Sequence, residues 1–271
     1  MTGPELECLA RDATTIAIEA GRAILEVYGQ DFEVIAKEDQ TPLTQADLAS
    51  HRIICDALGR LTPDIPLLSE ESAEIDFATR SAWQRYWLID PLDGTREFVS
   101  RNGEFTVNIA LIDDHEPVLG IVHVPVTGVT YSGVRGVGAT RSSPAEDIRS
   151  IHVRQPCGDP VVIVGSRSHA NPELEKYLRP LRHELVSMGS SLKFCLLAEG
   201  KADFYPRLGP TSEWDTAAAH AVVSAAGGRI VKLDGSPLRY NTKESLLNPE
   251  FLVIADPTRD WLSLFQGYGS S

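Results

Sequence analysis

Apolar residues recur at helical spacing in the first part of the chain. Over residues 5–28 the apolar positions are Leu6, Leu9, Ala13, Ile16, Ala17, Ala20, Ile24 and Tyr28. Gly29 follows them as a stop signal, so residues 5–28 are predicted to form an amphipathic helix. A second helix is predicted from Thr44, because Thr44-Gln-Ala-Asp47 resembles a capping box and an apolar face continues to Leu58.

Short apolar runs separated by turn signals fill the rest of the chain. They predict strands at residues 32–35, 67–68, 86–89, 105–112, 118–124 and 129–132. Residues 136–150, rich in Gly, Ser and Ala, are predicted to be a linker. Beyond them, strands at 161–164, 184–186, 203–205, 229–233 and 251–255 alternate with helices at 172–181, 191–199 and 214–226. This order predicts layered sheets and helices rather than a singly wound Rossmann domain.

Composition narrows the class of protein. A chain of 271 residues makes one large domain or two closely joined ones. Its net charge of −13 argues against a nucleic-acid polymer as partner, but it leaves a small phosphorylated substrate open. The N-terminus is acidic and resembles no secretory signal, and no apolar run reaches the length of a membrane span. The four cysteines form no C-x-x-C pair, so we expect reduced, buried thiols in a cytoplasmic protein.

Carboxylates stand where predicted elements end or begin. Asp90 and Asp93 follow the strand at 86–89, and Gly94 permits a sharp turn directly after them. Further carboxylates are Asp47 in the second helix, Glu70 after a strand and Asp215 at a helix start. A set made only of oxygen ligands selects hard cations such as Mg²⁺ or Mn²⁺. Two such ions could clamp the attacking and leaving oxygens of a phosphate ester.

Each of these carboxylates also has a structural explanation. Asp47 could stabilise a helix end, Glu70 could belong to a solvated pair with Glu71, and Asp215 could face a helix dipole. Asp90 is harder to explain in this way, because a buried carboxylate costs stability unless something pairs with it. Gly94 and Thr95 fit the start of a short helix, whose free N–H groups would face a phosphate.

Three motifs together resemble a known family. Leu68-Ser-Glu-Glu-Ser72, Asp90-Pro-Leu-Asp-Gly-Thr95 and Trp214-Asp-Thr-Ala-Ala218 are similar, in order, to the signatures of the inositol monophosphatase superfamily. Its members are Mg²⁺-dependent, lithium-sensitive phosphatases. Longer segments, at residues 86–98, 101–112, 187–195 and 205–210, resemble the bacterial CysQ branch, the 3'(2'),5'-bisphosphate nucleotidases.

The resemblance implies a fold. That fold is a layered αβαβα sandwich of the α/β (α+β) class. Residues 1–140 would form an α+β half with most metal ligands, and residues 141–271 an α/β half with Asp215 and the specificity residues. We expect the two halves to make one compact unit with the site between them.

The resemblance also implies roles for individual residues. Glu70, Asp90 and the carbonyl of Leu92 would hold one Mg²⁺, while Asp90, Asp93 and Asp215 would hold a second. A third Mg²⁺ would bind more weakly and would be coordinated by Glu70 through a water molecule. Asp47 and Thr95 would orient and deprotonate the attacking water, with Glu70 also counted as catalytic. Glu70, Leu92, Asp93 and Asp215 would contact the substrate too, beside the Gly94 and Thr95 amides that hold the phosphate.

Substrate choice is expected to reside in the second half of the chain. Ser190, Ser191 and Lys193 form a hydroxyl and ammonium cluster suited to a second phosphate. His169 would stack on adenine and Arg207 would add a cation, although surface or core packing is the alternative for both. The implied reaction converts adenosine 3',5'-bisphosphate to AMP, with the 2',5' isomer and 3'-phosphoadenylyl sulfate as further substrates.

Two other functions stay open on the sequence alone. One is an inositol monophosphatase or fructose-1,6-bisphosphatase of the same fold, and the other is a phosphonucleotide-binding regulator without turnover. The expected location is the cytoplasm. Peripheral attachment to the inner face of the inner membrane is an alternative, although no basic amphipathic helix enforces it.

Overall fold

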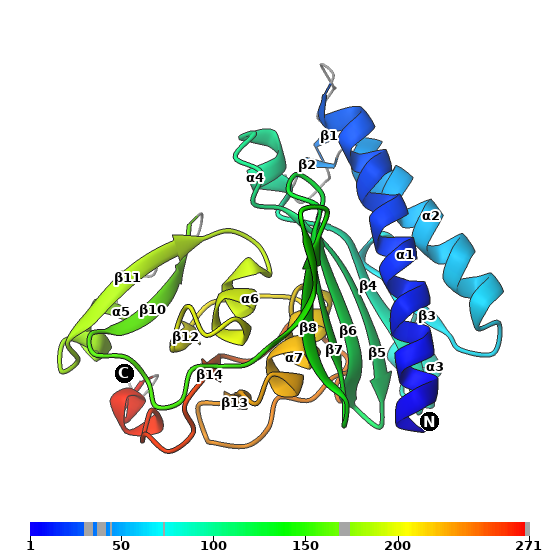
Figure 1. Cartoon of the computed structure of the whole chain (residues 1–271). Helices are drawn as coiled ribbons and strands as arrows, with labels where there is room; N and C mark the ends of the chain where they lie inside the picture. The colour runs from blue at the N-terminus through cyan, green and yellow to red at the C-terminus, as the bar shows by residue number, and fades with distance from the viewer. Residues whose placement is uncertain (30–34, 37–41, 44, 73, 168–173, 269–271) are drawn as a thin grey trace.

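Sheets and helices alternate through the molecule in layers (Figure 1). The computed structural model describes residues 1–29, 35–36, 42–43, 45–72, 74–167 and 174–268. Helices α1 and α2 cover one face of a seven-stranded sheet, and α6 and α7 lie between that sheet and a five-stranded one. Helix α5 and a final 3₁₀ turn, η2, lie against the outer face of the second sheet. The predicted αβαβα order is therefore confirmed.

The helices match the predicted apolar periodicity. They are α1 (Gly3–Tyr28), α2 (Gln45–Leu61), α3 (Phe77–Arg80), α4 (Thr95–Val99), α5 (Leu174–Leu178), α6 (Leu192–Ala198) and α7 (Glu213–Ala225), with 3₁₀ turns η1 (Glu70–Ser72) and η2 (Leu262–Phe265). The buried face of α1 carries the residues of the predicted stripe, including Leu6, Ala13 and Ile24. Within the described residues, no helix is both long and apolar enough to cross a bilayer.

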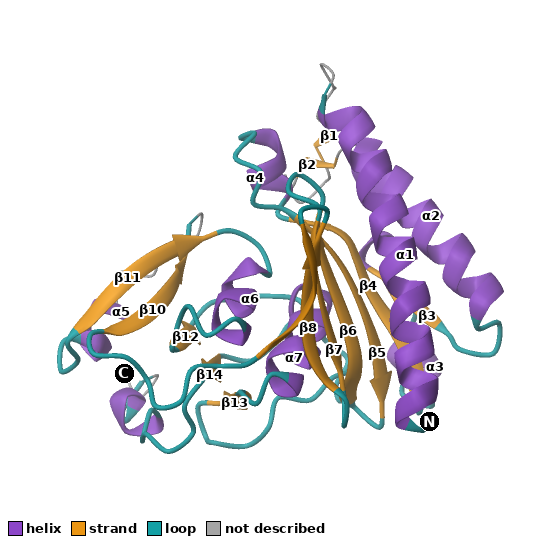
Figure 2. Ribbon diagram, in the orientation of Figure 1, coloured by secondary structure: helices purple, strands orange, loops and turns teal. Residues whose placement is uncertain are grey.

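The first sheet has the order β3-β4-β5-β6-β7-β8-β9 (Figure 2). Its strands are β3 (Leu67–Ser69), β4 (Arg85–Asp93), β5 (Thr106–Asp113), β6 (Glu116–Val124), β7 (Val129–Val134), β8 (Gly138–Ser143) and β9 (Glu146–Ile151). Only β3 and β4 pair in parallel, and every later neighbour is antiparallel. A small antiparallel pair, β1 (Ile35–Ala36) with β2 (Pro42–Leu43), lies outside this sheet.

The second sheet has the order β11-β10-β12-β14-β13. Its strands are β10 (Val161–Ser166), β11 (His183–Met188), β12 (Phe204–Arg207), β13 (Arg229–Lys232) and β14 (Phe251–Ile254). Strand β10 pairs in parallel with both β11 and β12, whereas β14 runs antiparallel to β12 and β13. Trp261, in the last part of the chain, stacks on Phe204 at 4.4 Å between ring centroids and so anchors the C-terminal segment to this sheet.

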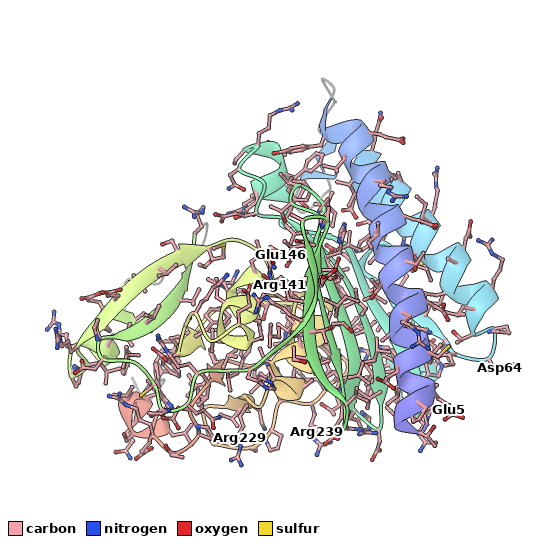
Figure 3. All side chains as sticks on the ribbon, viewed as in Figure 1. Glu5, Asp64, Arg141, Glu146, Arg229 and Arg239 are labelled. Atoms are coloured by element: carbon pink, nitrogen blue, oxygen red, sulfur yellow. The ribbon has the colours of Figure 1, made fainter. Side chains whose placement is uncertain are left out.

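The predicted linker at residues 136–150 is wrong. These residues form the β8–β9 hairpin at the edge of the first sheet, where Arg141 pairs with Glu146 (Figure 3). Strand β9 is exposed along most of its length, so its sequence needs no apolar alternation to remain paired. The expected division of the chain at residue 140 falls within β8. It stays a prediction.

The cysteines are less uniformly buried than predicted. Cys195 is buried, Cys55 and Cys157 are half-buried, and Cys8 is exposed. Cys8 lies on α1 opposite the apolar stripe, which explains why burial was the wrong expectation for it.

Helix α7 approaches the first sheet unusually closely. An added Cβ at Gly120 of β6 would lie 2.1 Å from the carbonyl oxygen of Ala218, and one at Gly133 of β7 would lie 2.4 Å from the Cα of Val222. Glycine at these two positions therefore lets the helix backbone rest directly on the strands. This contact seats α7 on the sheet from Ala218 to Val222, directly after the first turn that carries Asp215.

Gly120→Ala is expected to lower the free energy of unfolding by about 3 kcal/mol or more, because the methyl group has no room beside a backbone carbonyl. Gly59→Ala is the matched control. A Cβ at Gly59 of α2 meets nothing within 4 Å, so alanine there should be neutral or stabilising by up to about 1 kcal/mol. Urea unfolding of both variants measures the difference. Equal stabilities would contradict the close packing of α7.

His123 on β6 should make the protein sensitive to acid. Burial, together with the smaller effect of the Arg22 charge, lowers the pKa of His123 from 6.5 to about 4. Below pH 6.5 His123 therefore binds a proton in the unfolded chain but not in the folded chain. The free energy of unfolding falls as the pH falls from 6.5 towards 4. Its Nδ1 lies 2.8 Å from the Thr130 hydroxyl.

Between pH 7.5 and pH 5 this one residue should remove about 2 kcal/mol from the free energy of unfolding. A His123→Gln variant should lose correspondingly less over the same interval. Urea titrations of both proteins at the two pH values give the comparison, and parallel losses would exclude His123 as the cause.

Candidate active site

The end of β4 turns sharply into α4 at the predicted corner. The register between β4 and β5 shifts between Asp90 and Asp93, where Pro91 has no N–H for the ladder. The strand resumes at Asp93, so it extends further than the predicted 86–89. Gly94 then adopts the left-handed conformation, with φ 92° and ψ 47°, and Thr95 opens α4.

A cavity of about 330 Å³ lies at this corner. It brings together ten of the predicted residues, which are Glu70, Asp90, Leu92, Asp93, Gly94, Thr95, Ser190, Lys193, Arg207 and Asp215. They come from the end of β4, the starts of η1, α4, α6 and α7, the turn that leads into α6, and β12. Residues of both predicted halves therefore line one cavity.

Two of the predicted residues that the structure describes, Asp47 and Ser191, do not line this cavity. Asp47 is buried on the first turn of α2, close enough to Asp90 for its charge to affect that residue's pKa. Ser191 is buried and is not among the residues that line the cavity. His169 lies outside the described residues.

Burial and mutual repulsion dominate the electrostatics of the carboxylates. Burial raises the pKa of Asp90 well above its ordinary value, and the charges of Glu70, Asp93 and Asp215 raise it further. Burial also raises the pKa of Asp215, with the charge of Asp93 acting in the same direction. A bound cation would reverse these effects and keep the carboxylates ionised.

The donor chemistry at the corner fits a hard divalent cation, because the predicted side-chain ligands are all carboxylates, namely Glu70, Asp90, Asp93 and Asp215. Within the described part of the chain, however, no three His, Cys, Asp or Glu side chains are arranged to hold one metal ion. Asp90, Asp93 and Asp215 accept bonds from backbone N–H groups instead. The Leu92 N–H donates to Asp90 at 3.2 Å. The Ser191 N–H donates to Asp93 at 2.7 Å, and the Ser212 N–H donates to Asp215 at 2.9 Å.

The turn before α6 is bonded to the carboxylate corner. The Ser191 hydroxyl donates to the Asp215 carbonyl at 2.7 Å and accepts from the Asn108 amide at 3.0 Å. The Ser190 hydroxyl lies 2.7 Å from that of Thr106. Asn108 and Thr106 of β5 were missed as site residues, since a polar residue within an apolar strand gives no signal of what it contacts.

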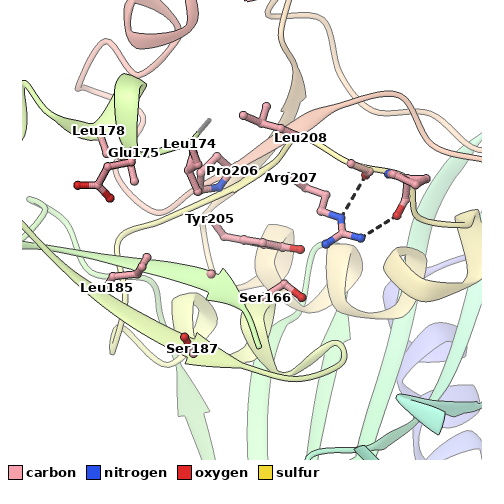
Figure 4. A pocket seen from close by; sticks show the side chains of 13 residues that line it. Ser166, Leu174, Glu175, Leu178, Leu185, Ser187, Tyr205, Pro206, Arg207 and Leu208 are labelled. Atoms are coloured by element: carbon pink, nitrogen blue, oxygen red, sulfur yellow. Dashed lines mark hydrogen bonds between the residues drawn. The ribbon is translucent and has the colours of Figure 1, made fainter. Parts of the chain in front are cut away.

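Two cations stand in the cavity with the carboxylates. Lys193 is 7% exposed, donates from Nζ to the Ser190 carbonyl and lies 5.8 Å from the Tyr205 ring centroid. Burial lowers the pKa of Lys193, and the charge of Asp93 opposes this effect. Arg207 is oriented by its own loop, donating to the carbonyls of Gly209 at 3.2 Å and Pro210 at 2.7 Å (Figure 4).

A second cavity, of about 540 Å³, adjoins the first. Figure 4 shows the side chains that line this second cavity. The two share Ser166, Tyr205 and Arg207 as lining residues. The side chains around the second cavity are mostly apolar and include Leu174, Leu178, Leu185, Pro206 and Leu208. An apolar group linked to a phosphate could therefore lie next to the charged cavity.

Helix α2 is fastened to the loops that carry the carboxylates. The Ser50 hydroxyl donates to the Pro91 carbonyl at 2.7 Å, and Nδ1 of His51 lies 2.9 Å from the Ser69 hydroxyl. These contacts set Asp47, one turn earlier on α2, relative to Asp90 and Glu70.

Comparison with known proteins agrees with this arrangement. The profile described as "Inositol monophosphatase family" matches residues 5–260. The chain belongs to the inositol monophosphatase family. Two members with which it aligns are both named 3'(2'),5'-bisphosphate nucleotidase CysQ. The Escherichia coli O157:H7 protein is 52% identical over 88% of this chain and 96% of its own length. The Aggregatibacter actinomycetemcomitans protein is 40% identical over 95% and 96%.

A solved structure of the family confirms the fold. The crystal structure of CysQ from Bacteroides thetaiotaomicron, described as a bacterial member of this family, superposes with a TM-score of 0.80. The two sequences are 42% identical, and the alignment covers 95% of this chain and 98% of that one. Metal dependence, with Mg²⁺ typical, comes with membership of the family.

Proposed function

We propose that this protein hydrolyses the 3'-phosphate of adenosine 3',5'-bisphosphate to give AMP and phosphate. The single observation that carries the proposal is the presence of Lys193 and Arg207 in the same cavity as the carboxylate cluster. The activity named for the CysQ relatives supports it. The 2',5' isomer has a 2'-phosphate in place of the 3'-phosphate, and 3'-phosphoadenylyl sulfate has a phosphosulfate at the 5' position. Both therefore also present two separated anionic groups and would fit the same arrangement.

A substrate with two separated phosphates matches the charges of the cavity. One phosphate would lie at the carboxylates with the metal, and the other would take the ammonium of Lys193 and the guanidinium of Arg207. The adjoining apolar cavity offers space for a nucleoside base. Inositol 1-phosphate has one anionic group and would leave Lys193 desolvated without a charged ligand, which is costly.

The carboxylates would hold two Mg²⁺ ions. Glu70, Asp90 and the Leu92 carbonyl would bind the first, and Asp90, Asp93 and Asp215 the second, with a third and weaker ion near Glu70. Bound Mg²⁺ supplies positive charge that polarises the phosphate ester and makes water a stronger acid. The assignment to the two ions is part of the proposal.

The chain's own residues would position the reacting groups. Asp47 would accept the proton of the attacking water, and the hydroxyl of Thr95 would orient that water. The backbone N–H groups of Gly94 and Thr95 would hold the phosphate being cleaved, since Gly94 places them at the start of α4. Lys193 and Arg207 would hold the other phosphate and so direct the 3'-phosphate to the carboxylates.

Product identity tests this function. With Mg²⁺ present, adenosine 3',5'-bisphosphate should yield adenosine 5'-monophosphate, separated from the 3' isomer by chromatography. Removal of Mg²⁺ with a chelator should abolish phosphate release, and added Mg²⁺ should restore it. Formation of the 3'-monophosphate, or turnover that survives the chelator, would contradict the proposal.

The free cysteines of the described chain support a cytoplasmic location as part of the same proposal.

A further inference from the structure

Glu104 joins segments that are far apart in the sequence. It lies between α4 and β5, beside the carboxylate corner. Its carboxylate accepts from Nε and Nη2 of Arg167, both at 2.7 Å, and from the Gly189 N–H at 2.7 Å. Arg167 follows β10, and Gly189 begins the turn into α6. One side chain of the first half thus holds two segments of the second.

The contact is tight where Glu104 meets the turn. A Cβ added at Gly189 would lie 2.7 Å from Cγ of Glu97 and 3.0 Å from both Cβ and the carbonyl oxygen of Glu104. One added at Gly94 would lie 3.2 Å from Cβ of Ser190 and 3.3 Å from the Glu104 carbonyl oxygen. The loop around Glu104, the Gly94 corner and the turn at Gly189 therefore touch at one place.

A short chain of bonds connects this place to Lys193. Gly189 is held by Glu104, the next residue is Ser190, and the Ser190 carbonyl accepts from Nζ of Lys193. Ser190 has a φ of 50°, in the left-handed region, so its carbonyl depends on contacts that keep the turn in this shape. Burial would raise the pKa of Glu104, but bonds from Arg167 and Gly189 lower it, so the carboxylate stays ionised.

We propose that Glu104 is a specificity-determining positioning residue, which fixes the turn at Gly189 and thereby places Lys193 for the second phosphate of the substrate. This rests on the function proposed above and extends it to a residue that does not touch the substrate. The guanidinium of Arg167 has a supporting part, because it orients the Glu104 carboxylate through a two-point contact.

Glu104→Ala tests the proposal through the second phosphate alone. The variant should bind adenosine 5'-monophosphate, which carries only that phosphate, about tenfold more weakly in calorimetry. Its KM for adenosine 3',5'-bisphosphate should rise by a similar factor, while kcat stays within about twofold. Adenosine 3'-monophosphate, which lacks the second phosphate, should show no such rise in KM.

Three further variants test how the KM and the binding of adenosine 5'-monophosphate depend on each contact of Glu104. Glu104→Gln should fall between wild type and Glu104→Ala, because its amide oxygen can still accept from Gly189. Arg167→Ala should have a smaller effect than Glu104→Ala, since the Gly189 bond survives. Glu116→Ala is the matched control: its carboxylate also joins two arginines, Arg135 and Arg239, but it lies apart from the substrate cavity and should change neither constant.

The outcomes separate this inference from the function it rests on. A Glu104→Ala protein with lower kcat and unchanged binding of adenosine 5'-monophosphate would overturn the inference, as would equal KM changes for the bisphosphate and the 3'-monophosphate. A wild-type protein that does not bind adenosine 5'-monophosphate would also overturn it. If the wild type binds this nucleotide but releases no phosphate from the bisphosphate, the activity is wrong and the binding comparison still decides the role of Glu104.

Discussion

Asp90→Asn is expected to lower kcat by about three orders of magnitude while the protein stays folded. Asp90 is proposed to contact both metal ions, so an amide in its place weakens two sites at once. In the metal-free protein the same change should be neutral or stabilising. It removes one charge from a buried group whose pKa is raised by burial and by its carboxylate neighbours. Phosphate release and urea unfolding give the two quantities.

Asp113→Asn is the control for this variant. Asp113 ends β5 away from the cavity and pairs with Arg85 at 3.0 Å, so its loss should cost at most about 1 kcal/mol and leave kcat unchanged. Activity near that of wild type in Asp90→Asn would exclude the two-metal arrangement. Inactivity together with unfolding would mean that Asp90 is needed for the fold.

Lys193→Met should raise the KM for adenosine 3',5'-bisphosphate by about 10-fold to 100-fold, the range expected for a lost charge-assisted hydrogen bond. Methionine keeps an apolar stem against the Tyr205 ring, so the buried position stays filled. Hydrolysis of inositol 1-phosphate, which has no second phosphate, should change far less. Steady-state kinetics with both substrates measures this difference.

The matched control is Lys232→Met. Lys232 is on β13 and pairs at 3.5 Å with Asp234, which is mostly exposed, so its charge should matter to neither substrate. If Lys193→Met impairs the hydrolysis of both substrates to the same extent, Lys193 contributes to catalysis in general and does not recognise the second phosphate.

The sequence predicted the layered fold because most elements bury an apolar face. The stripe of α1 and the apolar strand at Tyr86–Ile89 are read directly from spacing. The β8–β9 hairpin was missed because it lies at a sheet edge, where backbone hydrogen bonds suffice and β9 exposes most of its side chains. The end of β4 was also misjudged. Pro91 signals a strand end, but the register shift lets the strand resume.

The carboxylate corner was partly predictable for a local reason. Asp90, Asp93, Gly94 and Thr95 are neighbours in the sequence, and an acidic residue after a buried strand demands an explanation. Asp215 comes from a different element, and only the family resemblance joined it to the corner. The cavity brings these five residues together, while the metal roles assigned to them stay predictions.

Contacts between distant polar residues could not be read from the sequence. Glu104 and Arg167 are 63 positions apart, and neither breaks a local pattern, because a charged residue in a loop is ordinary. The hydroxyl of Ser191 was assigned to substrate, whereas the structure bonds it to Asn108 and the Asp215 carbonyl. The binding of the substrate's second phosphate by Ser191 stays a prediction.

The central claim is that the cavity acts on one phosphate while it holds another. The most direct test is phosphate release by the wild-type protein with Mg²⁺, from adenosine 3',5'-bisphosphate and from inositol 1-phosphate under the same conditions. The account predicts a kcat/KM at least about 100-fold higher for the nucleotide, the discrimination expected from a buried ammonium and a guanidinium that inositol 1-phosphate leaves unused. Equal values for the two substrates would contradict it.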